Sequence, residues 1–268
     1  MKTDFFTGKH VLISGGSSGI GLSLAQQLFE KGSHVTILAR RKDILQEAAR
    51  KIENYRQTPG QMLFTISADV SEFKQLEKSL SIQRNPVDIL INSAGVAYPG
   101  EFTKLDIDIF STVMDINYMG TVNLTKLIVP EMVERNTGHI VNISSLAAVI
   151  GIFGYTAYAP SKYAVRGFSR CLRAELKPKG INVSVVLPPD TDTPQLEFEH
   201  KLIPDTTLKI NQNGGVMSPE KVARIILSGV RKQRFTIIPG FEGKLLYMLS
   251  SIFGRYFYYF AVADQSQK

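Results

Sequence analysis

The sequence predicts an α/β protein in which a doubly wound, mostly parallel sheet of about seven strands is covered by helices on both faces. Short apolar runs rich in Val, Ile and Leu alternate with longer segments whose apolar residues recur at helical spacing. This alternation is typical of successive βαβ units, because parallel neighbours in a sheet need a crossover connection between them. The chain of 268 residues has no internal repeat and no linker. We therefore expect one domain over about residues 1–240 and an apolar C-terminal segment over 241–268.

Strands and helices follow each other in order along the chain. Strands are predicted over His10–Ser14, His34–Ala39, Met62–Ser67, Asp88–Asn92, His139–Ser144, Asn182–Leu187 and Phe235–Ile238. Helices are predicted over Gly19–Lys31, Asp43–Tyr55, Glu72–Gln83, Asp108–Arg135, Tyr158–Lys177 and Pro219–Lys232. Residues 191–217 break this order with two prolines and a run of Asn and Gly. We expect this insertion to be either a mobile lid over a binding site or an exposed connection.

Composition excludes several classes of protein. The net charge of +7 comes from scattered Lys and Arg residues, without the basic cluster that would indicate a nucleic-acid partner. The single cysteine, Cys171, excludes an internal disulfide, and the four histidines lack the spacing of metal ligands. The first residues run into the first strand without the apolar stretch of a secretory signal. We expect a cytoplasmic protein that binds neither metal nor nucleic acid.

A glycine-rich turn follows the first predicted strand. The run Ser14-Gly15-Gly16-Ser17-Ser18-Gly19-Ile20-Gly21 lies between that strand and the next helix. Glycines there permit a tight turn, and the unpaired amides at a helix N-terminus favour an anion such as a pyrophosphate. Glycine-rich turns also serve only as connections, but this position between strand and helix favours a Rossmann-type dinucleotide site. We expect its residues to be Gly15, Ser17, Ser18, Gly19, Ile20 and Gly21.

The end of the second predicted strand indicates which dinucleotide is bound. An NAD-specific fold usually has an acidic residue here for the ribose 2′-hydroxyl, whereas this chain reads Ala39-Arg40-Arg41-Lys42. A guanidinium binds phosphate oxygens in a bidentate manner, so Arg40 and Arg41 favour NADPH. The alternative is that these are solvated charges at the start of a helix, where the helix dipole mildly disfavours them.

Further motifs occur in a characteristic order. After the glycine turn come Asn92-Ser93-Ala94-Gly95, Asn117, Ser145 and Tyr158-x-x-x-Lys162. Over roughly residues 8 to 194, the sequence resembles the short-chain dehydrogenase/reductase family. Pro160 departs from the alanine that is more common in this family, but proline is tolerated in the first turn of a helix.

The residues of the Tyr-x-x-x-Lys motif suit proton transfer to a ketone. A phenol has an ordinary pKa near 10 and needs a positive charge beside it to act near neutrality. Positions four apart share one helix face, which predicts the Lys162 ammonium beside the Tyr158 oxygen. Ser145 would hydrogen-bond the substrate carbonyl oxygen and stabilise its developing charge.

The resemblance implies further roles in the site. It implies that Lys162 also holds the nicotinamide ribose and that Asn117 positions a water that relays the proton. It places Asp69 and Val70 at the adenine, and Asn92, Gly95, Pro188, Thr191 and Thr193 along the cofactor cleft. The alternatives are a helix cap at Asp69 and a simple turn at 92–95. It also implies a homo-oligomer.

The loop after the sixth predicted strand suggests a substrate class. Its sequence, Pro188-Pro189-Asp190-Thr191-Asp192-Thr193-Pro194, departs from the common Pro-Gly pair of the family. The variant is similar to that of reductases of 3-ketosphinganine, a hydrophobic long-chain amino ketone. The alternatives are a reductase of another hydrophobic ketone, such as a steroid, retinal or a 3-ketoacyl group, and a non-catalytic NADPH-sensing or scaffold protein.

The C-terminal segment is densely apolar. Residues 245–260 carry a narrow polar stripe of Ser250, Ser251, Gly254 and Arg255 at helical spacing. About 16 residues are too few for a bilayer span, which needs about 20, but suit a helix that lies in the membrane interface. Peripheral membrane contact and packing within the protein or a subunit interface remain open at this point.

Overall fold

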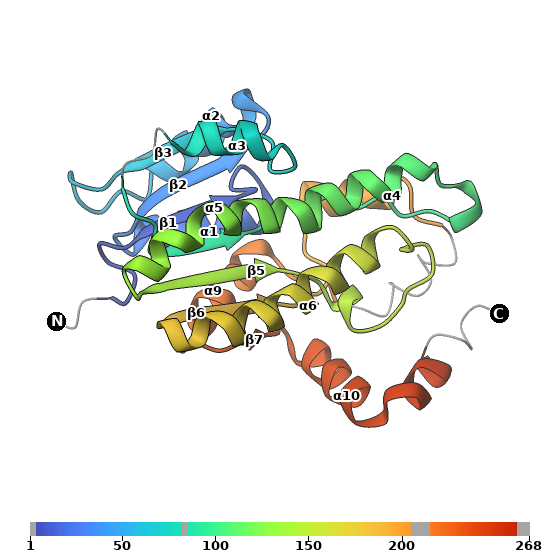
Figure 1. Ribbon diagram of the computed structural model, residues 1–268. Helices are drawn as coiled ribbons and strands as arrows, with labels where there is room; N and C mark the ends of the chain where they lie inside the picture. Colours follow the sequence, from blue (N-terminus) through green and yellow to red (C-terminus); the bar gives the residue numbers. More distant parts are fainter. Residues whose placement is uncertain (1–3, 82–84, 205–214, 262–268) are drawn as a thin grey trace.

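The computed structural model describes residues 4–81, 85–204 and 215–261, with side chains up to Phe253 (Figure 1). Its centre is a seven-stranded sheet of order β3-β2-β1-β4-β5-β6-β7, in which all neighbouring strands are parallel. The strands are β1 (His10–Ser14), β2 (His34–Ala39), β3 (Leu63–Ser67), β4 (Ile89–Asn92), β5 (Gly138–Ile143), β6 (Ile181–Val186) and β7 (Thr236–Ile237). The predicted fold class is confirmed.

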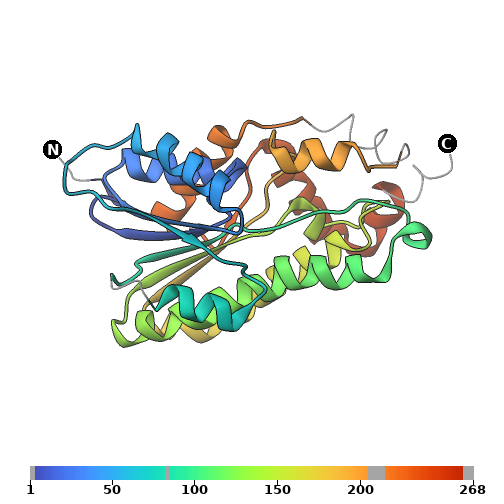
Figure 2. The ribbon, with the colours of Figure 1, turned by 90° about the horizontal axis from the view of Figure 1, so that it is seen from above.

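Helices cover both faces of this sheet (Figure 2). One layer consists of α1 (Gly19–Glu30), α2 (Lys42–Glu53) and α9 (Pro219–Arg231), and the other of α3 (Phe73–Leu80), α5 (Gly120–Glu134) and α6 (Tyr158–Leu176). The inner strands β1, β2, β4, β5 and β6 therefore bury both of their faces, whereas the edge strand β3 leaves Phe64 exposed. In β1, Val11 and Ile13 pack in the first apolar core, while Leu12 packs in the second.

The predicted helix Asp108–Arg135 is confirmed in its extent, but one of its turns is irregular. The structure has α4 (Ile107–Met114), a π-helical turn over Asp115–Met119 and then α5. One extra residue in a turn hardly changes the hydrophobic periodicity, so the sequence pattern predicts a regular helix across the π turn. The turn carries Asn117, and such π turns are frequent at functional sites. The predicted helix Glu72–Gln83 is α3, which ends at Leu80; residues 82–84 lie outside the described part.

The site lies where the order of the strands reverses. β1 lies between β2 and β4 in the sheet. The connection after β1 leads to β2 on one side, and the connection after β4 leads to β5 on the other, so the two run in opposite directions. The carboxyl ends of β1 and β4 are thus separated by a crevice, which is where open α/β sheets bind ligands. The glycine turn follows β1, and Ser93 to Gly95 follow β4.

The insertion after β6 is anchored at its base. Thr191 forms a parallel bridge with Met217, and the Asp192 amide donates to the Met217 carbonyl over 2.9 Å. Between them the chain forms α7 (Pro194–His200), which irregular composition alone did not predict. Residues 205–214 of the predicted lid lie outside the described part, and its mobility stays a prediction.

The predicted C-terminal segment forms α10 (Phe241–Ala261), which extends away from the sheet (Figure 1). Residues 262–268 of the segment lie outside the description. Within the described ranges, every helix is too short or too polar to cross a bilayer.

Candidate active site

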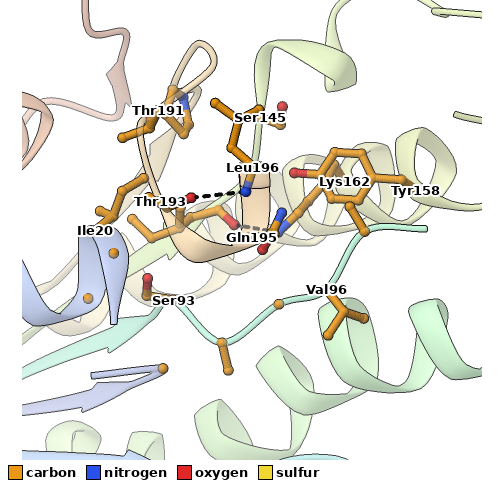
Figure 3. Close-up of a pocket in the computed structure, with 18 of the residues that line it drawn as sticks. Ile20, Ser93, Val96, Ser145, Tyr158, Lys162, Thr191, Thr193, Gln195 and Leu196 are labelled. Carbon is orange, nitrogen blue, oxygen red and sulfur yellow. Dashed lines mark hydrogen bonds between the residues drawn. The ribbon is translucent and has the colours of Figure 1, made fainter. Parts of the chain in front are cut away.

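A cavity of about 850 Å³ opens at the carboxyl end of the sheet. This volume suits a small-molecule or cofactor site, for which roughly 300–1,000 Å³ is usual. All but two of the site residues predicted from the sequence line the cavity; the exceptions are Asn92 and Asn117. Figure 3 shows how Ser145, Tyr158 and Lys162 lie opposite the residues of the β6–α7 connection.

The glycine turn has the shape that a dinucleotide pyrophosphate requires. Gly15 and Gly19 have positive φ angles of 67° and 52°. A side chain at Gly15 would place a Cβ 2.8 Å from the Ala94 backbone, and one at Gly21 would lie 2.2 Å from the Gly15 carbonyl oxygen. The turn therefore packs too tightly for side chains at these positions, and its glycines line the cavity at the N-terminus of α1, where free amides favour an anion. The turn fits the predicted nicotinamide dinucleotide.

The residues of the predicted 2′-phosphate site follow β2, the neighbour of β1 in the sheet. Arg40 and Arg41 both line the cavity, and the Arg40 side chain is 57% exposed. Arg40 forms an ion pair with Asp69 over 3.4 Å. Burial alone would raise the pKa of Asp69, but hydrogen bonds from Ser71 and the charge of Arg40 together lower it. Asp69 thus holds Arg40 at the rim of the cavity, a contact that the sequence did not predict.

The catalytic residues come from two elements that pack together. Ser145 follows β5 and caps the short 3₁₀ helix η3 (Leu146–Ala148) by accepting from the Ala147 amide over 3.1 Å. Tyr158 and Lys162 lie one turn apart at the start of α6. Lys162 is buried and donates to the Ile143 carbonyl, 3.2 Å away, at the end of β5. The predicted trio therefore meets in one place (Figure 3).

Lys162 lies against the ring of Tyr158. Lys162 Nζ lies 5.5 Å from the centroid of the Tyr158 ring. The pKa of Tyr158 is raised by burial and by the negative charges of Glu199 and Asp190, although hydrogen bonds with Ser145 and Gln195 lower it. Burial lowers the pKa of Lys162 to about 8, against the opposing charge of Glu199. In this structure burial and two carboxylates therefore keep the phenol pKa above its ordinary value, and the lowering by Lys162 stays a prediction.

Asn117 acts on the backbone of the site and does not line the cavity. Its side-chain oxygen accepts from the Val96 amide over 2.8 Å, and its amide donates to the Val96 carbonyl and to Ser161 Oγ, each over 2.9 Å. These bonds use both hydrogens of the amide. The side chain thus fixes the loop after β4 against α6, which places Gly95 beside Lys162. The predicted water relay would need a group other than these engaged amide hydrogens.

Asn92 is likewise a structural residue. Its amide donates to Asn142 Oδ1 over 2.8 Å and to Thr125 Oγ1 over 3.1 Å, and its side chain is buried. Asn92 is therefore not among the residues that line the cavity, and its contact with the cofactor stays a prediction. The loop that follows it does line the cleft, because Ser14 Oγ accepts from the amides of Ser93 and Ala94 and holds that loop against β1.

The β6–α7 connection closes over the glycine turn. Thr193 caps α7 by accepting from the Leu196 amide over 3.3 Å (Figure 3), and its methyl group lies against Gly19. Thr191 Oγ1 donates to the Pro189 carbonyl over 2.9 Å. Pro188, Thr191 and Thr193 all line the cavity, as predicted.

Several lining residues escaped the sequence analysis. Glu199 and Gln195 project from α7, Asp190 precedes it, and Tyr155 lies one turn before Tyr158. Glu242, Gly243 and Leu246 of α10 also reach the cavity. Asp190 belongs to the loop over Pro188–Pro194, where the sequence analysis gave it no role, and Tyr155 is close to Tyr158 in the chain. The lining residues of α7 and α10 belong to no spaced motif, and the packing of these two helices against the catalytic domain brings them to the site. Within the described residues, no group of three His, Cys, Asp or Glu side chains could hold a metal ion.

The chain is similar to known proteins over most of its length. The family model for short chain dehydrogenases matches residues 9–201. The 3-dehydrosphinganine reductase of Danio rerio is 40% identical over 91% of this chain and 74% of its own. The 3-ketodihydrosphingosine reductase of Dictyostelium discoideum is 36% identical over 96% and 81%. The solved structure of a short-chain dehydrogenase from Sphingobium yanoikuyae in complex with NADPH has a TM-score of 0.78 and 27% identity, covering 92% of this chain and 94% of that one.

These matches agree with the geometry. The matched residues 9–201 contain the glycine turn, the trio of Ser145, Tyr158 and Lys162, and α7. The same trio and turn line one cavity at the switch point of a parallel sheet. The chain therefore belongs to the short-chain dehydrogenase/reductase family, whose members are oxidoreductases that use a nicotinamide cofactor.

Proposed function

We propose that this protein uses NADPH to reduce 3-ketosphinganine to sphinganine, a step of sphingolipid biosynthesis. The observation that carries this proposal is the similarity to reductases named for this ketone. 3-Dehydrosphinganine and 3-ketodihydrosphingosine are two names of that compound, and the two relatives cover at least 91% of this chain. The similarity extends beyond the family match at 9–201, so it includes parts of the chain that are not shared by the whole family.

The residues of the site can perform a ketone reduction. NADPH, when bound, supplies the hydride that the carbonyl carbon accepts. Ser145 Oγ is placed to donate a hydrogen bond to the carbonyl oxygen, and the Tyr158 hydroxyl is placed to give that oxygen its proton. Lys162, buried behind the phenol ring, contributes positive charge that stabilises the phenolate left after proton transfer.

Arg40 supports the choice of NADPH. Its guanidinium lies at the rim of the cavity and carries charge that a 2′-phosphate would complement. Its pairing with Asp69 is exposed and leaves other guanidinium hydrogens available. A 2′-hydroxyl lacks the charge to use this site.

A hydrophobic substrate fits the wall opposite the glycine turn. That wall is formed by apolar side chains from the β4 loop, the segment before α6, α7 and α10, among them Tyr98, Ile150, Ile152, Leu196, Phe198 and Leu246. Tyr98 and Phe198 pack edge to face with ring centroids 5.4 Å apart. An alkyl chain can therefore lie against these side chains while its ketone faces Tyr158.

A panel of ketones tests the proposal. We expect NADPH consumption with 3-ketosphinganine to exceed that with a steroid ketone, retinal and a 3-ketoacyl thioester, measured by NADPH absorbance and product mass. If one of the other ketones has the highest kcat/KM, the enzyme is a reductase of that compound. If NADPH binds but no ketone is reduced, the protein is a sensor or scaffold.

Helix α10 supports peripheral contact with a membrane. Phe241, Leu245, Met248 and Ile252 are exposed and recur at helical spacing, with Phe241 78% and Ile252 66% exposed. Since α10 also lines the cavity, a lipid-soluble ketone could enter from the membrane that this face contacts. We propose that the protein lies in the cytoplasm and contacts the surface of a membrane through this face.

The exposed apolar face of α10 could instead pack against a second copy of the chain, as in the predicted homo-oligomer. Met248→Glu with Ile252→Glu should abolish co-sedimentation with phosphatidylcholine vesicles, whereas Lys244→Gln, an exposed control on the same helix, should not. Loss of an oligomer with no change in vesicle binding would assign the face to subunit packing.

A further inference from the structure

A buried carboxylate lies in the cavity beside the catalytic residues. Glu199 of α7 is 7% exposed and lines the cavity. Its Oε2 accepts a hydrogen bond from the Tyr155 hydroxyl and its Oε1 accepts one from Gln195 Nε2, each over 2.8 Å. Each oxygen can still accept a further hydrogen bond. The carboxylate is thus held in one position and can still accept hydrogen bonds from a ligand.

This carboxylate is close enough to the reacting groups to act on them. The rings of Tyr155 and Tyr158 have centroids 5.7 Å apart, so Tyr155 connects Glu199 to the proton donor. The charge of Glu199 raises the pKa of both Tyr158 and Lys162. Asp190, which lines the same cavity, also raises the pKa of Tyr158.

Among the residues that the structure describes, the two carboxylates have no ion-pair partner. Within residues 4–81, 85–204 and 215–261, no Lys, Arg or His nitrogen comes within 4.0 Å of either one. Lys162 and His200 affect the local electrostatics only from longer range. Burial raises the pKa of Glu199, and hydrogen bonds from Gln195 and Tyr155 oppose that rise. A buried carboxylate is costly unless a positive charge compensates it, and the open side of this one faces the substrate space.

We infer that Glu199 is a specificity-determining residue whose carboxylate binds the ammonium group of an amino ketone, with Asp190 adding a second negative charge. This inference rests on the proposed function, because 3-ketosphinganine carries its amine on the carbon next to the ketone. When that ketone faces Ser145 and Tyr158, its ammonium group must lie within the same part of the cavity. Gln195 and Tyr155 are positioning residues that keep the carboxylate in place.

The arrangement also couples substrate choice to proton transfer. Without a cation, Glu199 and Asp190 make Tyr158 a weaker proton donor by raising the pKa of its phenol. An ammonium group beside these carboxylates offsets their charge and restores the donor strength of the phenol. A ketone that lacks the amine leaves the opposing charge in place, so it is disfavoured in kcat as well as in binding.

The test compares two substrates in several variants of the full-length enzyme. The substrates are 3-ketosphinganine and its analogue with hydrogen in place of the amino group. Glu199→Gln keeps the shape and removes the charge, and it replaces one of the two acceptor oxygens with an amide donor, which Gln195 can meet by turning its own amide oxygen toward it. We expect this variant to lower kcat/KM for the amino ketone by about 10- to 100-fold, the range for loss of a charged hydrogen bond, and to leave that for the analogue unchanged or raised, because the charge that opposes proton donation is gone.

Further variants separate charge from structure. Glu199→Asp should restore part of the preference for the amino ketone, and Tyr155→Phe should weaken it without abolishing it. Glu197→Gln removes the same charge from an exposed position of α7 outside the cavity, and we expect it to retain the wild-type preference. Thermal unfolding and NADPH titration of each variant report whether its fold and cofactor site are intact.

Each outcome bears on the inference. If Glu199→Gln lowers kcat/KM equally for both substrates, Glu199 only stabilises the position of α7. That result would overturn the inference while the proposed function stands. A wild-type enzyme that reduces the analogue as well as the amino ketone would overturn it in the same way. A wild-type enzyme that reduces other ketones but not 3-ketosphinganine would refute the proposed function and the ammonium site together.

Discussion

Replacing Gly21 with alanine sets two opposing effects against each other. Gly21 lies in the first turn of α1, where alanine is favoured over glycine by about 1 kcal/mol in helix propensity. The new Cβ, however, would lie 2.2 Å from the Gly15 carbonyl oxygen and 2.8 Å from its carbonyl carbon. Both are backbone atoms of a turn with φ of 67°, so the turn and the helix must move apart. Overpacking of this kind costs about 1–3 kcal/mol, so crowding outweighs propensity.

We expect Gly21→Ala to weaken NADPH binding by about tenfold or more, since each 1.4 kcal/mol is a factor of about ten and the displaced turn carries the amides for the pyrophosphate. Fluorescence titration with NADPH and thermal unfolding measure the two effects. The control is Gly167→Ala in α6, where no described atom lies within 4 Å of the new Cβ; it should bind NADPH normally and unfold at the same or a higher temperature. If Gly21→Ala binds NADPH as tightly as the wild type and is more stable, the close approach does not shape the site.

Two further predictions concern the cofactor and stability. Arg40→Ala should weaken NADPH binding by about tenfold while changing NADH binding less than about twofold; an equal loss for both would contradict the 2′-phosphate role. His139 is buried, with a ring nitrogen 2.8 Å from Ser184 Oγ, and burial lowers its pKa to about 4 from 6.5. The unfolded chain therefore takes up this proton first, so between pH 6.5 and 4 the wild type should lose up to about 3 kcal/mol more unfolding free energy than His139→Gln. The unfolding free energies come from denaturant titrations at each pH. An equal loss in both proteins between pH 6.5 and 4 would refute this assignment.

The local signals in the sequence were sufficient for the sheet, the glycine turn and the catalytic trio. β1 and its glycines are adjacent in the chain, and Tyr158 and Lys162 are one helical turn apart, so both arrangements depend on short-range geometry. Ser145 could be placed because it directly follows a strand, and parallel strands end at one edge of the sheet. These features are encoded by spacing along a single element.

The features that were missed depend on contacts between distant segments. Asn117 sits in a π-helical turn and bonds to Val96 and Ser161, whereas periodicity indicated an uninterrupted helix. Glu199 enters the site because α7 folds back over the cavity, and no spacing to Tyr158 marks it. The ion pair of Arg40 with Asp69 joins the ends of β2 and β3 in the same way. Each requires the tertiary packing to be known first.

The central claim is that Tyr158 donates the proton in an NADPH-dependent reduction of 3-ketosphinganine. Its most direct test is the steady-state rate of sphinganine formation by the wild type and by Tyr158→Phe, which keeps the ring but removes the hydroxyl. We expect the wild type to form sphinganine with NADPH and the variant to be slower by about 10²- to 10⁴-fold in kcat, with NADPH binding retained. Full activity in the variant would contradict the account.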